Sequence, residues 1–210
     1  MSRLNVSVII LDFGGVLGKF DHWFIARALA HFSRYSAEEI YARVFDGGLE
    51  EAYDCGRVST PQFLASVRAT LGLDLCPGSL AGIWSGLFSR SPANERVIRV
   101  LNRIPGNVRL FLASNTNELH ARVIRSDWSD ILERMAGTVL SYEVGCRKPA
   151  AEYFVHLATV INARPDEALF VDDRKQNCAA AAVAGIRTCH FGQAVDFEAV
   201  LSEFGIRLSE

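Results

Sequence analysis

From Pro92 onward, short apolar runs alternate with stretches of helical periodicity, and each run stops at polar or turn residues. A similar run, Val8 to Leu11, stands near the start of the chain. The runs are VIIL, VRLFLA and ALFV, and IRTCHF follows as a further strand. Short buried strands that alternate with helices are typical of βαβ units. The pattern therefore predicts an α/β fold around a parallel sheet.

In the region from Pro92 onward, residues typical of helix ends predict three helices. Ser91 stands in the N-cap position and Pro92 at the first helical position of a helix that continues through NERVIRVLNRI. The stretch KPAAEYFVHLATVI predicts a second helix that starts at Pro149. A third helix, AAAAVA, closes at Gly185.

The region between the first strand and Pro92 is helical and contains no strand-like run. Ser36 and Glu39 form a capping box before one of its helices. Thr60 and Pro61 occupy capping positions before another.

A helical segment inserted after the first strand of a parallel sheet would lie over the carboxyl ends of the strands, where ligands bind in such folds. We therefore expect this segment to form a cap or lid. The expected division is a core of residues 1–15 and 91–210 and a helical cap of residues 16–90.

Composition limits the classes of partner. Of the 210 residues, 50% are apolar and 22% are charged, and the formal net charge is −2. This balance is typical of a globular domain and provides no basic surface for nucleic acid or for a membrane. The chain also lacks an apolar run of about 18 residues, which a membrane span requires. We expect a small molecule or another protein as the partner, and nothing in the sequence indicates an oligomeric state.

The cysteines are scattered, without the spacing of a zinc site or of a disulfide framework. There are five: Cys55, Cys76, Cys146, Cys178 and Cys189. We interpret them as small, mostly buried thiols of a reduced compartment. Because a strand begins within a few residues of Met1, no targeting segment is apparent, and we expect a soluble cytoplasmic protein.

Polar residues follow the apolar runs or a strand-to-helix turn. They form four clusters: Asp12, Ser114–Asn115, Arg147–Lys148 and Asp172–Asp173. Because the carboxyl ends of parallel strands share one edge of a sheet, these clusters should converge there. Several carboxylates at close quarters repel one another unless a cation lies among them, and hard oxygen ligands suit Mg²⁺. The chemistry that this predicts is phosphoryl transfer, in which positioning and charge neutralisation dominate catalysis.

Each cluster has a simpler alternative explanation when taken singly. Asp12 could cap a turn, and Ser114 with Asn115 could cap the following helix. Lys148 could be a solvated loop charge, and the acidic pair could cap a helix at its positive end. A coincidence of all four is implausible, so the set favours an active site. His22, at the start of the first cap helix, could touch a substrate, but a surface or core role is favoured.

The motifs that carry these clusters resemble, in the same order, the four motifs of the haloacid dehalogenase superfamily of hydrolases. They are ILDFGGVL, LASNTN, LSYEVGCRKPAAEYF and LFVDDRKQNCAAAAVAGI. The resemblance covers nearly the whole chain and implies a Rossmann-like core with a small helical cap. Within the superfamily the chain is most similar to the branch that contains bacterial glucose-1-phosphate phosphatases and the phosphatase domain of soluble epoxide hydrolases.

The resemblance also implies a role for each motif residue. Asp12 would be the nucleophile that forms an aspartyl-phosphate and would also ligate Mg²⁺. Ser114, with the backbone of Asn115, would bind the phosphoryl oxygens. Lys148 would neutralise charge on the nucleophile and the phosphate. The remaining ligand pair is Asp173, bound directly to the metal, and Asp172, which supports it from beside the metal.

Gly14 departs from the usual pattern of the family. Most of its phosphatases have a second aspartate there, which protonates the leaving oxygen and whose backbone carbonyl ligates Mg²⁺. Gly14 retains the carbonyl and lacks the carboxyl group, so we expect metal binding without the general acid, whose contribution is typically about 10²–10⁴-fold. We hypothesise that a leaving group of low pKa makes this loss tolerable.

Three functions follow from this reading. The first is a Mg²⁺-dependent phosphatase acting on a small phosphorylated metabolite, such as a sugar phosphate. The second is a 2-haloacid dehalogenase, against which the acidic pair Asp172–Asp173 argues, because such enzymes usually have serine and asparagine there. The third is a catalytically silent binding protein that lost the acid at Gly14 and retained the pocket.

Overall fold

The computed structural model describes residues 6–192 and 194–209. Its main sheet has five parallel strands in the order β5-β4-β1-β6-β7. The strands are β1 (Val8–Leu11), β4 (Arg109–Ser114), β5 (Met135–Leu140), β6 (Ala168–Asp172) and β7 (Arg187–His190). This confirms the predicted α/β fold with a Rossmann-like parallel sheet.

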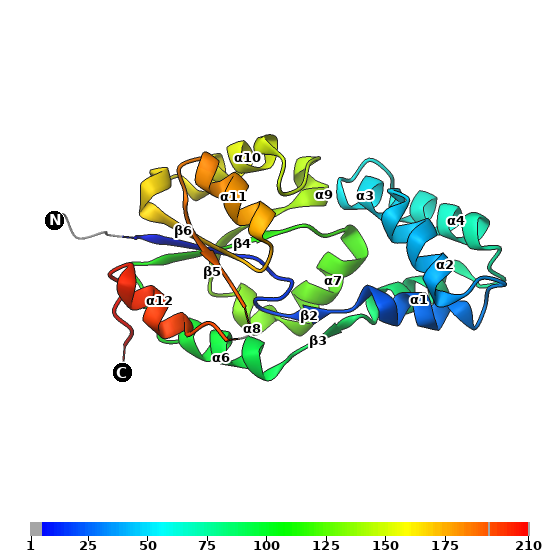
Figure 1. Cartoon of the computed structure of the whole chain (residues 1–210), viewed down its shortest axis with the longest axis horizontal. Coiled ribbons are helices and arrows are strands. Elements are labelled where there is room, and N and C mark those ends of the chain that lie inside the picture. Colours follow the sequence, from blue (N-terminus) through cyan, green and yellow to red (C-terminus); the bar gives the residue numbers. More distant parts are fainter. Residues whose placement is uncertain (1–5, 193, 210) are drawn as a thin grey trace.

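Helices cover both faces of the sheet (Figure 1). Alternate residues of β1 point to opposite faces: Ile9 and Leu11 pack with α6, α7 and α12, whereas Val8 and Ile10 pack with α10 and α11. The helical elements are α6 (Pro92–Leu101), α7 (Glu118–Asp127), α8 (Ser129–Leu132), α9 (Ser141–Val144), α10 (Ala151–Ile161), η2 (Pro165–Glu167), α11 (Lys175–Val183) and α12 (Phe197–Glu203). Because both faces are covered, the strands read as continuous apolar runs.

The segment between β1 and α6 forms a separate group of helices, which we call the helical insert (α1 to α5). Its elements are α1 (His22–Ala30), α2 (Ala37–Tyr41), the π-helical turn η1 (Ala42–Asp46), α3 (Leu49–Asp54), α4 (Thr60–Leu71) and α5 (Pro77–Ser85). The insert has its own hydrophobic cluster around the fully buried Trp84 and Phe63. Figure 1 places α1 to α4 beyond α7 and α9, at the opposite end of the molecule from α12.

Four local predictions need correction. A two-residue antiparallel pair, β2 (Lys19–Phe20) with β3 (Phe88–Ser89), lies where the chain enters and leaves the insert, a region expected to contain no strand. Strand β5 is absent from the prediction. Helix α10 begins at Ala151, two residues after Pro149. The N-cap of α4 is Ser59, so Thr60 and Pro61 already lie inside the helix.

The ends of the other helices agree with the sequence. Ser91 caps α6 in a capping box with Asn94, and Pro92 is its first residue. Gly185, with a φ of 81°, follows the end of α11 in the left-handed conformation that favours glycine. Within the described residues, no helix is long and apolar enough to cross a membrane.

Candidate active site

Asp12 follows the last residue of β1 and is buried, with 7% of its surface exposed. Its backbone N–H donates to the carbonyl of Val171 at 2.9 Å, which extends the pairing of β1 with β6 by one residue. Its Oδ1 accepts from the backbone N–H of Phe13 at 2.7 Å and lies 2.9 Å from Lys148 Nζ. The sheet therefore fixes the backbone of Asp12, and two donors fix its carboxylate.

Lys148 is also buried, and its three ammonium hydrogens have three acceptors. Nζ lies 2.9 Å from Asp12 Oδ1, 2.8 Å from Asp172 Oδ2 and 2.7 Å from the carbonyl of Ala113. Burial alone would lower the pKa of Lys148, but the carboxylates of Asp12 and Asp172 outweigh it and raise that pKa above its usual value. A positive charge is thus fixed beside the candidate nucleophile.

Asp172, the last residue of β6, has no exposed surface, and both of its oxygens accept hydrogen bonds. Besides Lys148, its donors are the backbone N–H of Arg174 at 2.9 Å and the amide of Asn177, 3.0 Å from each oxygen. Asp173 is more exposed, and the pKa of its carboxyl is raised by partial burial and by the charge of Asp172.

The carboxylates of Asp12, Asp172 and Asp173 each offer an oxygen, and these oxygens lie within 4.8 Å of one another. Burial raises the pKa of Asp12 to about 7; Lys148 opposes this shift, and the charges of Asp172 and Asp173 add to it. Lys148 therefore does not fully compensate the negative charge gathered here. A hard divalent cation would do so, and an all-oxygen donor set suits Mg²⁺. The residues present thus fit the expected metal.

Gly14 lies against an aromatic ring. A Cβ atom at this position would lie 2.3 Å from Cε1 of Phe20, so the ring occupies the space that a side chain would need. Gly15 has a φ of 74°, and a Cβ atom there would lie 2.4 Å from Asp173 Oδ2. Both glycines therefore permit close approach, the first of Phe20 and the second of Asp173.

Ser114 and Asn115 stand at the end of β4. Ser114 is buried, and its Oγ donates to the carbonyl of Asn115 at 3.4 Å. The Asn115 side chain makes two bonds to the backbone of Lys148: Oδ1 accepts from its N–H at 2.8 Å, and Nδ2 donates to its carbonyl at 2.9 Å. Asn115 therefore positions the loop that carries Lys148, a role that the sequence did not indicate.

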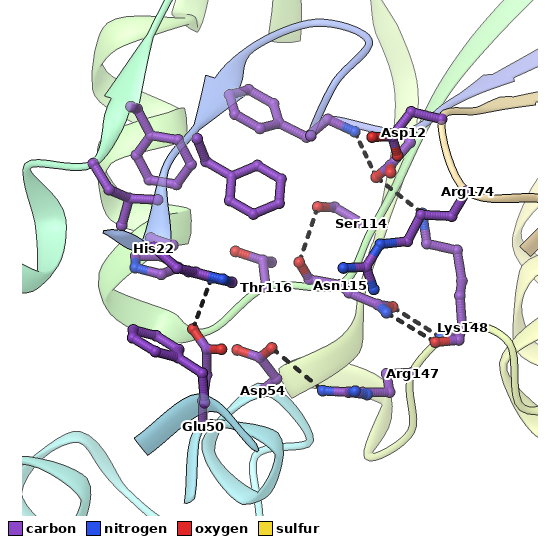
Figure 2. Close-up of a pocket in the computed structure, with 18 of the residues that line it drawn as sticks. Asp12, His22, Glu50, Asp54, Ser114, Asn115, Thr116, Arg147, Lys148 and Arg174 are labelled. Carbon is purple, nitrogen blue, oxygen red and sulfur yellow. Dashed lines mark hydrogen bonds and ion pairs between the residues drawn. The ribbon is translucent and has the colours of Figure 1, made fainter. Parts of the chain in front are cut away.

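A pocket joins the strand ends to the helical insert (Figure 2). Six of the seven predicted site residues line it, and the seventh, Asp172, is fully buried beside Lys148. The six are Asp12, Gly14, Ser114, Asn115, Lys148 and Asp173. Arg147 and Arg174 line the pocket as well.

The insert contributes pocket residues that the sequence analysis missed, among them Glu50 and Asp54 of α3. His22 also lines the pocket, which supports the alternative that it could touch a substrate. In the sequence, a pair of acidic residues on a short helix looks like part of a solvated surface. Only the packing of α3 against the core shows that Glu50 and Asp54 line a pocket instead. His120 is buried against Asn117 and the carbonyl of Trp84, and burial lowers its pKa to about 4.

Residues 6–185 match the family model of the haloacid dehalogenase-like hydrolases. The match covers most of the chain, and the protein therefore belongs to this family of hydrolases.

Three relatives illustrate the likeness. A D-ribitol-5-phosphate phosphatase of Bacteroides thetaiotaomicron is 26% identical over 208 residues, which cover 95% of this chain and 93% of that protein. A haloacid dehalogenase family enzyme of the same species, crystallised with magnesium and inorganic phosphate, superposes with a TM-score of 0.80 at 22% identity, covering 93% of this chain and 99% of that one. The L-2-haloacid dehalogenase of Xanthobacter autotrophicus gives a TM-score of 0.63 at 16% identity, covering 93% and 81%. The two structural likenesses show the fold.

Proposed function

We propose that this hydrolase is a Mg²⁺-dependent phosphatase that acts on a small sugar or polyol phosphate through an aspartyl-phosphate on Asp12. One observation carries the proposal: a buried carboxylate at the end of β1 is held by a buried lysine and adjoins two further carboxylates. The name of the curated relative, a ribitol-phosphate phosphatase, supports the substrate class. The predicted cytoplasmic location stays a prediction.

The proposed reaction has two steps, in which residues of this chain take part. An oxygen of Asp12 forms a bond to phosphorus as the bond to the ester oxygen breaks, and the leaving oxygen takes up a proton from solvent water. A second water then attacks phosphorus and breaks the bond to Asp12, which releases the carboxylate and inorganic phosphate and returns a proton to the solvent. Lys148 and the donors at Ser114 and Asn115 stabilise the charge on the phosphoryl oxygens. Mg²⁺, held by Asp12, Asp173 and the Gly14 carbonyl with Asp172 beside them, would add further charge neutralisation.

We further propose that the helical insert acts as the cap of this site. Pocket residues from α1 and α3 face those at the strand ends, so a bound substrate would lie between the insert and the core. Exclusion of water from such a site strengthens the electrostatic interactions inside it.

The decisive experiment measures phosphate release from p-nitrophenyl phosphate and from a panel of sugar and polyol phosphates, with Mg²⁺ or with EDTA. Metal-dependent turnover that is lost in the Asp12→Asn variant supports the proposal. Chloride release from 2-chloropropionate would instead support a dehalogenase. A folded protein that binds Mg²⁺ and turns over no phosphate would support a silent binding protein.

A further inference from the structure

Two acidic side chains of the insert line the pocket and have no part in the phosphoryl chemistry proposed above. Glu50 and Asp54 lie four residues apart on α3, one helical turn, and are 7% and 8% exposed. In Figure 2 they lie across the pocket from Asp12. Burial of two carboxylates is unfavourable unless they have partners or a function.

Each of the two carboxylates has one oxygen that accepts no hydrogen bond from the described residues. Oε1 of Glu50 lies 3.2 Å from Nε2 of His22, and among the described residues no hydrogen bond reaches its other oxygen. Oδ1 of Asp54 accepts from Nδ2 of Asn117 at 3.0 Å, whereas its Oδ2 has Arg147 at 3.9 Å, beyond hydrogen-bond distance. Each residue thus keeps an acceptor oxygen for a ligand.

The neighbours of this pair hold it in place. The ring of His22 stacks on Phe45 with centroids 4.5 Å apart. Tyr53, beside Asp54 in α3, accepts from the backbone N–H of Leu119 at 3.2 Å through its hydroxyl oxygen. The carboxylates are therefore preorganised, which lowers the cost of ordering them around a substrate.

The charge around the pair is negative on balance. The guanidinium group of Arg147 lies 3.9 Å from Oδ2 of Asp54 and 3.5 Å from Oε2 of Glu51. Its positive charge is therefore shared between two acidic residues of α3. Burial and the charge of Glu50 raise the pKa of Asp54 well above its usual value. Carboxylate oxygens accept hydrogen bonds, and the hydroxyl groups of a substrate can donate them.

We propose that Glu50 and Asp54 determine substrate specificity: they bind the hydroxyl groups of a neutral, polyhydroxylated leaving group and exclude leaving groups that carry a negative charge. The inference rests on the proposed phosphatase function and adds the residues that select its substrate. Attraction comes from hydrogen bonds to the free oxygens, and exclusion comes from repulsion of a second anion at short range.

The first test compares ribitol 5-phosphate with p-nitrophenyl phosphate, which has no hydroxyl groups on its leaving group. In Glu50→Ala and in Asp54→Ala, the ratio of kcat/KM for the first substrate to that for the second should fall about tenfold or more, as expected for the loss of a charge-assisted hydrogen bond. Glu51→Ala is the matched control, because Glu51 lies on the same helix without lining the pocket, and it should keep the ratio of the wild type.

The second test uses variants that preserve side-chain volume, so that loss of folding does not decide the result. Glycerol 3-phosphate and 3-phosphoglycerate differ in a hydroxymethyl group against a carboxylate. The wild type should prefer the former, and the Glu50→Gln/Asp54→Asn variant should reduce that preference about fivefold or more, since neutral amides no longer repel the anion. A preference that stays unchanged, or an equal change in Glu51→Ala, would overturn the proposal. Absence of Asp12-dependent turnover of p-nitrophenyl phosphate would instead refute the phosphatase function itself.

Discussion

Lys148 joins two buried acidic residues through one ammonium group, and at this residue stability and the proposed catalysis depend on the same contacts. Nζ contacts Asp12, Asp172 and the carbonyl of Ala113, all within 3 Å. A buried ion pair adds little net stability relative to an apolar replacement of both partners, but removal of one partner leaves an uncompensated charge. Two acidic residues would be left in that state here.

Lys148→Met should therefore lower the free energy of unfolding by about 3–5 kcal/mol and abolish turnover, because two buried carboxylates lose their cation. Urea denaturation in EDTA measures the stability without metal. Lys19→Met is the control, since Lys19 is exposed and its replacement should change stability by less than about 0.5 kcal/mol. Wild-type stability of Lys148→Met would contradict this account of the ion pair.

Gly14 offers a second test at the level of single residues, because Phe20 stands in the way of any side chain there. Gly14→Asp alone should lose about 1–3 kcal/mol through overpacking. Gly14→Asp/Phe20→Ala makes room for the carboxyl group, which could then protonate the leaving oxygen. Its rate on glycerol 3-phosphate should rise about tenfold or more relative to Phe20→Ala, within the usual contribution of a general acid.

The same two variants also show whether the gain in rate is specific to substrates whose leaving oxygen needs a proton. p-Nitrophenolate leaves without protonation, so its rate should not follow the gain. If both substrates gain equally, or neither does, the hypothesis that a low-pKa leaving group compensates for Gly14 fails.

Helix α3 connects the insert to the core at several points. Asp54 bonds to Asn117 of the core, and Tyr53 bonds to the backbone of Leu119 in α7. Directly after this helix, Gly56 has a φ of 63°, and a Cβ atom there would lie 2.2 Å from the carbonyl oxygen of Tyr142. The position of Glu50 and Asp54 over the pocket thus depends on a backbone contact that only glycine allows.

Gly56→Ala should lower stability by about 2–3 kcal/mol and raise KM for sugar phosphates several-fold, because strain and the clash displace α3. Gly72→Ala is the matched control. Gly72 also has a positive φ, 60°, but no atom lies within 4 Å of its Cβ position, so only the backbone strain of about 1–2 kcal/mol applies and KM should not change. Thermal unfolding and steady-state kinetics measure both effects. Equal KM values for the two variants would argue against α3 as the substrate-positioning element.

The strands that are easiest to predict from the sequence are those buried on both faces. Strands β1, β4 and β6 are buried on both faces, so each is a continuous apolar run. The first four residues of β5 alternate between partly buried and exposed positions, so the strand is not a continuous apolar run. It also contains Gly137, and glycine is depleted in strands. The pair β2–β3 is two residues long on each side, too short for any periodicity.

The residues of the candidate site also divide into those that could be predicted from the sequence and those that could not. Asp12, Lys148 and the acidic pair were predictable because each follows a strand or loop of a recognisable motif. The roles assigned to them stay predictions until they are measured. Glu50 and Asp54 were not predictable, because their sequence context is that of an ordinary amphipathic helix. Asp54 contacts Asn117 and Arg147, which are distant in the sequence, and Glu50 contacts His22 of another helix.

At the scale of the whole molecule, three hydrophobic clusters support two separate parts of the pocket. The clusters on either face of the sheet hold the carboxylates and Lys148 in register, whereas the separate cluster of the insert supports α3 and its acidic pair. Under the proposed role of Glu50 and Asp54, we expect a change in the insert to alter which substrate is bound. This division favours the insert as the part of the chain that sets specificity.

Metal binding should be visible in the stability of the whole chain, because the carboxylates of Asp12, Asp172 and Asp173 come together only in the folded state. A ligand at 100 times its Kd stabilises the native state by about 2.7 kcal/mol. For a chain of this length that corresponds to a rise in Tm of about 5–10 °C. We expect this shift when the EDTA-treated protein receives saturating Mg²⁺.

Asp173→Asn should lose most of this shift, since it removes a proposed ligand that is not needed to pair Lys148. Asp166→Asn serves as the control, because Asp166 pairs with Arg164 on the exposed turn before β6 and should leave the shift intact. Differential scanning fluorimetry with and without Mg²⁺ measures all three proteins under the same conditions. An equal shift in Asp173→Asn would place the metal elsewhere, and no shift in the wild type would mean that the three carboxylates hold no Mg²⁺ in the free enzyme.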